Sequence, residues 1–239
     1  MPPNGRRRLL WSSNGTSLLL IFLPHFLRKS AIFFFKNAVK KIVEKNAVIF
    51  SPGDPGTHIY YVVSGRIKIY SLAREGREVI YWFCTPKDFF GLAELCGGAR
   101  RTVFAEAVEK TELLCISQRH FEELIQRNPE ISFALMHVFG SRIRKAHDTI
   151  KNLVTCDVRS RVAQLITKLG KVVGEQSEKG IELRNKFTHQ EMADMIGATR
   201  TTVTEVISSF KRQGIIQYEA GKITILDSAK LLDLIQSAE

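Results

Sequence analysis

Cysteine is scarce in this 239-residue chain, which has only four, at positions 84, 96, 115 and 156. No two of them form a CxxC pair, and no histidine stands near them at the spacing of a metal ligand. Isolated cysteines of this kind argue against a disulfide framework and against a zinc or iron–sulfur site. We therefore expect free thiols, no metal site and a cytoplasmic location.

Long apolar runs are also absent. The most apolar stretch, residues 18–27, is interrupted by Pro24 and His25, whereas a helix needs about 20 apolar residues to cross a bilayer. Three arginines at residues 6–8 imitate the basic start of a signal peptide, but no small-residue cleavage site follows before Arg28. We expect neither export nor integral membrane association. A peripheral membrane contact of this segment is the alternative.

Acidic residues are few in the first part of the chain. Residues 1–48 hold nine basic side chains and one acidic side chain, so they carry most of the net charge of +11. A basic excess favours a polyanionic partner without distinguishing nucleic acid from a membrane surface. We expect residues 1–37 to form a basic, apolar and loosely ordered N-terminal extension.

Catalytic signatures are missing. The chain has no P-loop, no HExxH sequence, no Ser-His-Asp spacing and no loop with paired carboxylates, and its six histidines are scattered. We therefore expect that the protein is not an enzyme, and we assign no catalytic residue.

What the chain does have, from residue 38 to residue 117, is a series of short β-type runs separated by turn sequences such as SPGDPG and AREGRE. Apolar residues alternate with polar ones in these runs, as in half-buried strands. Gly65 and Gly76 stand where tight turns need positive φ. The spacing predicts an antiparallel barrel or sandwich, and we assign residues 38–130 to a jelly-roll-like β-roll.

A long helical pattern follows, and we place this helix at residues 131–154. Its apolar residues recur at intervals of three or four and form one stripe: Ile131, Leu135, Phe139, Ile143, Ala146, Ile150 and Leu153. A stripe of this length needs a surface to cover it. That surface is the β-roll or the same helix of a second copy, in a coiled-coil-like homodimer, and the two are compatible.

The helical periodicity breaks near residues 154–157, and we assign residues 155–239 to a second domain. Its strongest signal is HQEMADMIGATRTTVTEVIS, residues 189–208. A helix-turn-helix needs a small residue where the helices touch and a glycine at the turn, and Ala193 and Gly197 meet these needs. An alternating segment around residues 220–221 predicts a β-hairpin that serves as the wing. The overall prediction is an α+β protein with a C-terminal winged helix-turn-helix.

The second helix of this motif, at about residues 199–210, is the predicted recognition helix. The first turns of such a helix read base edges in the major groove of double-stranded DNA. Arginine can hold guanine, threonine can contact a base or a phosphate, and glutamate can accept from cytosine. The DNA-binding candidates are Thr199, Arg200, Thr201, Thr202, Thr204 and Glu205.

Taken together, these features resemble the cyclic AMP receptor protein and fumarate–nitrate reduction regulator (Crp/Fnr) superfamily. The resemblance covers about residues 38–235 and is carried by SPGDPG, VVSGRIKIY, FFGLAEL, NLVTCDVRSRVAQLI and TRTTVTEVISSFKRQGII. It implies a homodimer joined by the long helices, a small effector in each roll and a palindromic operator. It also implies RNA polymerase as a partner, as in a transcription activator, although the sequence does not distinguish activation from repression.

The resemblance also allows the effector to be weighed. Cyclic-nucleotide-binding members use a glycine, a glutamate for the ribose and an Arg-Ser pair for the phosphate; here Gly91, Arg101 and Thr102 match. Leu92 follows the glycine, however, and Glu94 lies two residues further on. The phosphate half of such a site is therefore matched and the sugar half is not. The effector-binding candidates are Gly91, Leu92, Glu94, Arg101, Thr102 and Arg142.

Other sensing chemistries of the family fit less well. The N-terminal cysteine cluster of the oxygen sensors is missing, and so is the roll histidine of the haem-based sensors. Members that bind 2-oxoglutarate carry an arginine at the position of Arg142, but His147 replaces an acidic residue of their pattern. We assign no cofactor. We expect a small anionic effector, a cyclic nucleotide or a 2-oxoglutarate-like anion, held by Arg101 and Arg142. The alternative function is a cyclic-nucleotide-binding regulatory protein without sequence-specific DNA binding.

Overall fold

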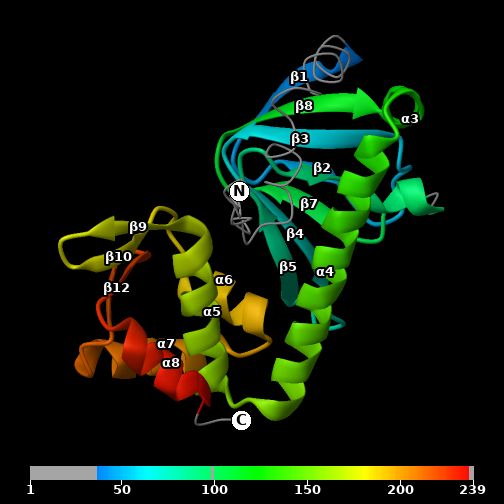
Figure 1. Cartoon of the computed structure of the whole chain (residues 1–239). Helices are drawn as coiled ribbons and strands as arrows, with labels where there is room; N and C mark the ends of the chain where they lie inside the picture. Colours follow the sequence, from blue (N-terminus) through cyan, green and yellow to red (C-terminus); the bar gives the residue numbers. More distant parts are fainter. Residues whose placement is uncertain (1–36, 98–99, 237–239) are drawn as a thin grey trace, which may run out of the picture.

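The computed structural model describes residues 37–97 and 100–236. A β-roll and a smaller C-terminal domain are joined by one long helix, α4 (Glu130–Thr155), which runs along the roll and then past it (Figure 1). The predicted α+β architecture, with a roll, a long helix and a winged helix-turn-helix, is confirmed. The N-terminal extension expected at residues 1–37 lies outside the described residues, apart from its last residue.

The roll consists of two four-stranded antiparallel sheets. One sheet has the strand order β1-β8-β3-β6, with β1 (Val39–Val43), β8 (Thr111–Ser117), β3 (His58–Ser64) and β6 (Phe89–Phe90). The other has the order β2-β7-β4-β5, with β2 (Val48–Phe50), β7 (Phe104–Ala107), β4 (Ile67–Leu72) and β5 (Glu78–Cys84). Alternate residues of these strands point between the sheets, so the core contains the fully buried Val62, Ile67 and Leu113.

Gly65 makes the turn from β3 to β4 possible. Its φ is +85°, and a Cβ atom at this position would overlap Thr111 and the carbonyl of Lys110. Only glycine combines this backbone conformation with such a close approach. The predicted need for glycine here is confirmed.

Two helical segments cover one end of the roll. The 3-10 helix η1 (Ala93–Cys96) lies between β6 and β7, and α3 (Gln118–Arg127) follows β8. Phe121 and Leu124 of α3 pack against Ile59 of β3 and Leu135 of α4. This cluster anchors the start of the long helix on the roll.

The rest of α4 has a different environment. Its buried residues are Leu135 and Val138, both in the first half, whereas Ile143 and Ile150 are 57% and 60% exposed. The stripe predicted from the sequence is therefore covered by the roll only at its beginning. No helix in the described part of the chain is long and apolar enough to span a membrane.

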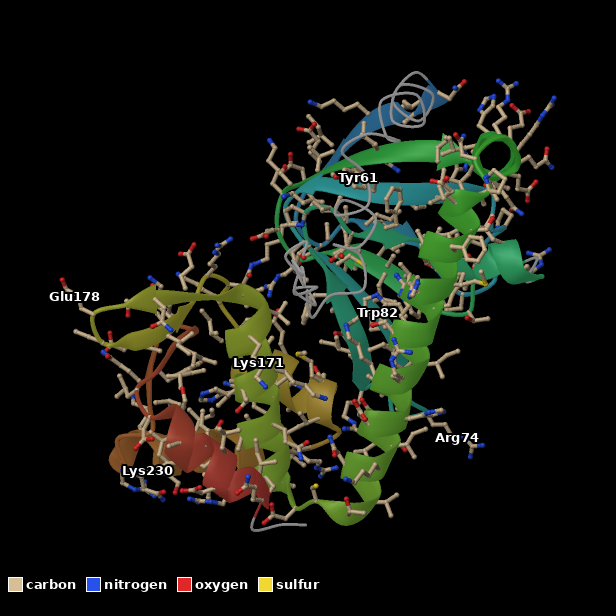
Figure 2. The ribbon with its side chains drawn as sticks, in the orientation of Figure 1. Tyr61, Arg74, Trp82, Lys171, Glu178 and Lys230 are labelled. Carbon is tan, nitrogen blue, oxygen red and sulfur yellow. The ribbon has the colours of Figure 1, made fainter. Side chains whose placement is uncertain are left out.

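The C-terminal domain begins with α5 (Val158–Val173), whose first turn is capped by Asp157. A hairpin of β9 (Gly174–Ser177) and β10 (Gly180–Leu183), with Glu178 at its tip in Figure 2, precedes the helix-turn-helix. That motif comprises α6 (His189–Ile196) and α7 (Arg200–Arg212). The predicted wing is present as β11 (Ile216–Glu219) and β12 (Lys222–Ile225), followed by α8 (Ser228–Gln236). The sequence analysis did not predict β9 and β10, which extend the wing to a sheet of order β11-β12-β10-β9.

The two domains also touch directly, because α6 packs against β5 (Figure 1). Phe83 of β5 packs against the core of the C-terminal domain and meets the ring of Phe187 edge-on. The Arg66 guanidinium lies 4.6 Å from the Phe83 ring centroid and 5.1 Å from that of Phe187. Arg66 also donates to the carbonyl of Lys186 and forms a 3.5 Å ion pair with Glu191. Arg66, only 7% exposed, is thus held between the domains.

Candidate functional sites

The helix-turn-helix is built by local capping. Thr188 accepts from the backbone N–H of Glu191, and the Glu191 carboxylate accepts from the backbone N–H of Thr188, which together form a capping box. Gly197 ends α6 with φ of +66°, and Thr199 caps α7 by accepting from the N–H of Thr202. These caps fix where the recognition helix begins and therefore which side chains occupy its first turn.

Besides the cap residue Thr199, three of the predicted DNA-binding side chains are exposed, all on the first two turns of α7: Arg200, Thr201 and Glu205. Within residues 37–97 and 100–236 no hydrogen bond or ion pair engages the Glu205 carboxylate. The helix N-terminus adds unpaired backbone N–H groups and a positive dipole end, which favour a phosphate. The surface is therefore suited to hold DNA and to hydrogen-bond base edges.

The other three threonines are engaged within the protein. The Thr199 and Thr202 hydroxyl oxygens are 2.8 Å apart, as part of the cap. The Thr204 hydroxyl donates to the carbonyl of Arg200 at 2.8 Å and lies 2.8 Å from Nδ1 of His189. His189 was not predicted from the sequence, because nothing in the helical periodicity marks a contact between residues 15 positions apart.

In the roll, the structure brings together three of the predicted effector-binding residues: Gly91, Glu94 and Arg101. Arg101 is 3% exposed, forms an ion pair with Glu94, and donates to the carbonyl of His58. Gly91 has φ of +74°, and a Cβ atom there would lie 2.9 Å from Nη1 of Arg101. Although Glu94 is displaced in sequence from the family's position, η1 turns its carboxylate back to the arginine.

The guanidinium of Arg101 also faces an aromatic wall. Its Cζ lies 4.2 Å from the ring centroid of Phe50, which neighbours Tyr60 and Phe90. Nε of Arg101 is buried and has no hydrogen-bond partner. A buried arginine with a spare N–H can accept a further anionic or carbonyl oxygen.

The remaining three candidates lie apart from this group. Leu92 is buried in the cluster that anchors α3 and α4, and Thr102 is exposed. Arg142 donates to the carbonyl of Phe89 at 2.9 Å, and its Cζ lies 5.0 Å from the ring centroid of Trp82, which Figure 2 places beside α4. Within the described residues there is no cluster of histidine, cysteine and carboxylate side chains that could hold a metal ion.

A roll with a buried arginine, joined to a winged helix-turn-helix with an exposed recognition helix, defines an effector-responsive DNA-binding transcription regulator. Comparison with known proteins supports this class. Residues 40–128 match the family model of the cyclic nucleotide-binding domain, and residues 160–234 match that of the Crp-like helix-turn-helix domain. The second match favours a DNA-binding regulator over a cyclic-nucleotide-binding protein without DNA function.

Individual relatives also support this class of protein. The CRP-like cAMP-activated global transcriptional regulator of Mycobacterium tuberculosis is 30% identical over 183 residues, which is 77% of this chain and 82% of the relative. The global nitrogen regulator of Nostoc sp. is 30% identical over 78% of this chain and 85% of its own length. A solved structure of a CooA variant from Carboxydothermus hydrogenoformans is 26% identical and superposes with a TM-score of 0.74, covering 86% of this chain and 90% of that one. The chain belongs to the Crp/Fnr family of transcription regulators, whose matched members are not enzymes.

Proposed function

We propose that the protein is a homodimeric transcription regulator that binds a palindromic operator through two copies of α7 and responds to a small anionic effector in the roll. The observation that carries the proposal is the free, exposed set Arg200, Thr201 and Glu205 on the first turns of α7. Such a regulator acts on DNA in the cytoplasm. Because the chain belongs to the Crp/Fnr family, RNA polymerase is its expected partner.

The exposed face of α4 supports the homodimer. Seven residues follow one another at alternating spacings of three and four: Phe133, Met136, Gly140, Ile143, His147, Ile150 and Val154. The five apolar side chains among them are between 57% and 80% exposed. Alternation of three and four is the a/d repeat of a two-stranded coiled coil, so we call this set the α4 seam. A second copy of α4 would cover it.

The buried arginine supports an anionic effector. The Glu94 carboxylate already neutralises the Arg101 guanidinium. An anionic ligand therefore binds to this ion pair and not to an unpaired cation. A ligand with both an anionic group and a hydroxyl, such as a cyclic nucleotide, can bind Arg101 and donate to Glu94 at once. A dicarboxylate such as 2-oxoglutarate has no hydroxyl and must compete with Glu94.

This difference gives a direct test. Titration calorimetry with cyclic AMP, cyclic GMP and 2-oxoglutarate should reveal binding of one class that Arg101→Leu weakens about tenfold or more, because a charge-assisted hydrogen bond contributes about 1.5–3 kcal/mol. Glu94→Gln should weaken a cyclic nucleotide and strengthen a dicarboxylate. An affinity that Arg101→Leu leaves unchanged would place the effector site elsewhere.

The DNA-binding function is tested by selection from random duplexes followed by gel shift, with and without each effector. We expect a selected palindrome with two half-sites about one helical turn apart, since the two recognition helices of a dimer enter successive major grooves. Selection that returns no consensus under any effector condition would contradict the proposal.

A further inference from the structure

His189 lies where the three DNA-binding elements of the C-terminal domain meet. It is the first residue of α6; its Nδ1 is 2.8 Å from the Thr204 hydroxyl of α7, and its ring centroid is 4.6 Å from that of Tyr218 in β11. The Tyr218 hydroxyl in turn donates to the carbonyl of Phe187, just before α6. The imidazole therefore bridges the first helix, the recognition helix and the wing.

The direction of the hydrogen bonds follows from the donors available. The Thr204 hydroxyl has a single proton, and it donates that proton to the carbonyl of Arg200 at 2.8 Å. The Thr204 oxygen must then accept from His189, so Nδ1 carries the imidazole proton. Burial, together with the positive charges of Arg200 and Lys211, lowers the pKa of His189 and keeps the ring neutral. Its Nε2 is buried and unpaired, which suits the unprotonated nitrogen of this tautomer.

This bond restricts a side chain that is otherwise free to turn. A helical threonine divides between two χ1 rotamers because its hydroxyl can bond the carbonyl four residues earlier. That back-bond also tends to bend a helix. By donating to the Thr204 oxygen, His189 selects one χ1 rotamer of Thr204. This rotamer fixes the hydrogen bond from the Thr204 hydroxyl to the carbonyl of Arg200, the first residue of α7.

We infer that His189 is a positioning residue for base reading: through Thr204 it sets the first turn of α7, from which the Arg200 side chain reaches the DNA. The inference rests on the proposed DNA-binding function and deepens it in one respect. With its hydroxyl occupied, Thr204 does not read bases, and base specificity is left to Arg200, Thr201 and Glu205.

Two variants of the full-length protein separate the hydrogen bond from the packing of the ring. His189→Asn places an amide N–H near the position of Nδ1 and lacks the ring, whereas His189→Phe keeps a ring against Tyr218 and lacks the donor. The measured quantity is discrimination. It is the dissociation constant for a duplex in which the half-site guanine pair is replaced, divided by the dissociation constant for the selected operator. The free energy of unfolding of each variant, from denaturant titration, is the control for folding.

We expect His189→Phe to reduce discrimination about three- to tenfold, which is the range of one neutral hydrogen bond, and His189→Asn to stay within about twofold of the parent protein. Thr204→Val removes the acceptor, so adding His189→Phe to it should reduce discrimination no further. The Thr204→Val single variant should itself show the loss expected of His189→Phe, and this second route does not depend on the stability of the histidine variants.

Two results would overturn the inference alone. One is a folded His189→Phe variant with unchanged discrimination, which would show that the ring matters and the hydrogen bond does not; the other is an equal loss in the Asn and Phe variants, which would show that an N–H donor to Thr204 does not preserve base reading. If the parent protein itself shows no discrimination, the proposed DNA-binding function and this inference both fail.

Discussion

The α4 seam gives the most demanding prediction, because two substitutions should convert a dimer into a monomer. The perturbation is Ile143→Asp combined with Ile150→Asp. These side chains are 57% and 60% exposed in the single chain. Full burial of an isoleucine contributes about 1.5–3 kcal/mol, so covering the remaining surface contributes about 1–2 kcal/mol for each side chain.

A symmetric dimer contains four such side chains, and their burial contributes about 4–8 kcal/mol to association. The loss of this term alone raises the dissociation constant at least about 1,000-fold. The aspartates add a further penalty, because four carboxylates without partners would be buried between the helices. We therefore expect the double variant to be monomeric at micromolar concentration and to bind a palindromic operator poorly.

Sedimentation equilibrium measures the dissociation constant of the parent and variant proteins. Leu72→Asp is a matched control, because Leu72 is 50% exposed on β4 of the roll and the substitution introduces the same charge away from α4. The control should remain dimeric. A parent protein that is monomeric at micromolar concentration and still binds its operator specifically, or a double variant that remains dimeric, would refute the reasoning.

Other predictions concern DNA reading, the N-terminal segment and one thiol. Arg200→Ala should cost about 1–3 kcal/mol of operator affinity and relax the preference at one base pair, as measured by selection sequencing. Glu205→Arg should shift the preferred half-site and strengthen phosphate contact; an identical consensus for parent and variant would deny Glu205 a base-reading role. Removal of residues 1–30 should leave folding and specific binding intact while lowering the salt dependence of non-specific binding, since five basic side chains are lost. Burial raises the pKa of Cys84 to about 12, so iodoacetamide should not label this thiol in the folded protein at pH 8, and rapid labelling would contradict the buried assignment.

The fold was predictable because its signals are local. Strand alternation, Gly65 at its turn and the capping box of Thr188 and Glu191 each depend on neighbours a few residues apart, and each is present. The long helix was predictable for the same reason. Its stripe combines two surfaces, because Ile131 and Leu135 face the roll whereas Ile143 and Ile150 are exposed in the α4 seam.

The site residues that escaped prediction depend on distant partners. Arg66 contacts Lys186 across 120 positions, and the sequence around Arg66 resembles any exposed turn. Glu94 was a predicted candidate, but its ion pair with Arg101 was not predictable, because it forms only where η1 turns the carboxylate back, and a count of positions after Gly91 does not reveal this. His189 was invisible for a similar reason, because its partners lie on two other elements.

The place of Arg66 between the domains has a consequence for proteolysis. Trypsin cleaves after arginine, but Arg66 is 7% exposed and follows a tight turn, so the Arg66–Ile67 bond is protected while the C-terminal domain rests on β5. Cleavage there requires the domain to move away from the roll and β4 to open, because Ile67 is fully buried and pairs with Cys84 and Ala107. The cleavage rate follows the population of that open form when opening is fast. Cleavage of this one peptide bond therefore measures how often the domain leaves the roll and β4 opens together. Adding effector or operator DNA should speed or slow its cleavage according to whether the bound protein holds the two domains apart or together.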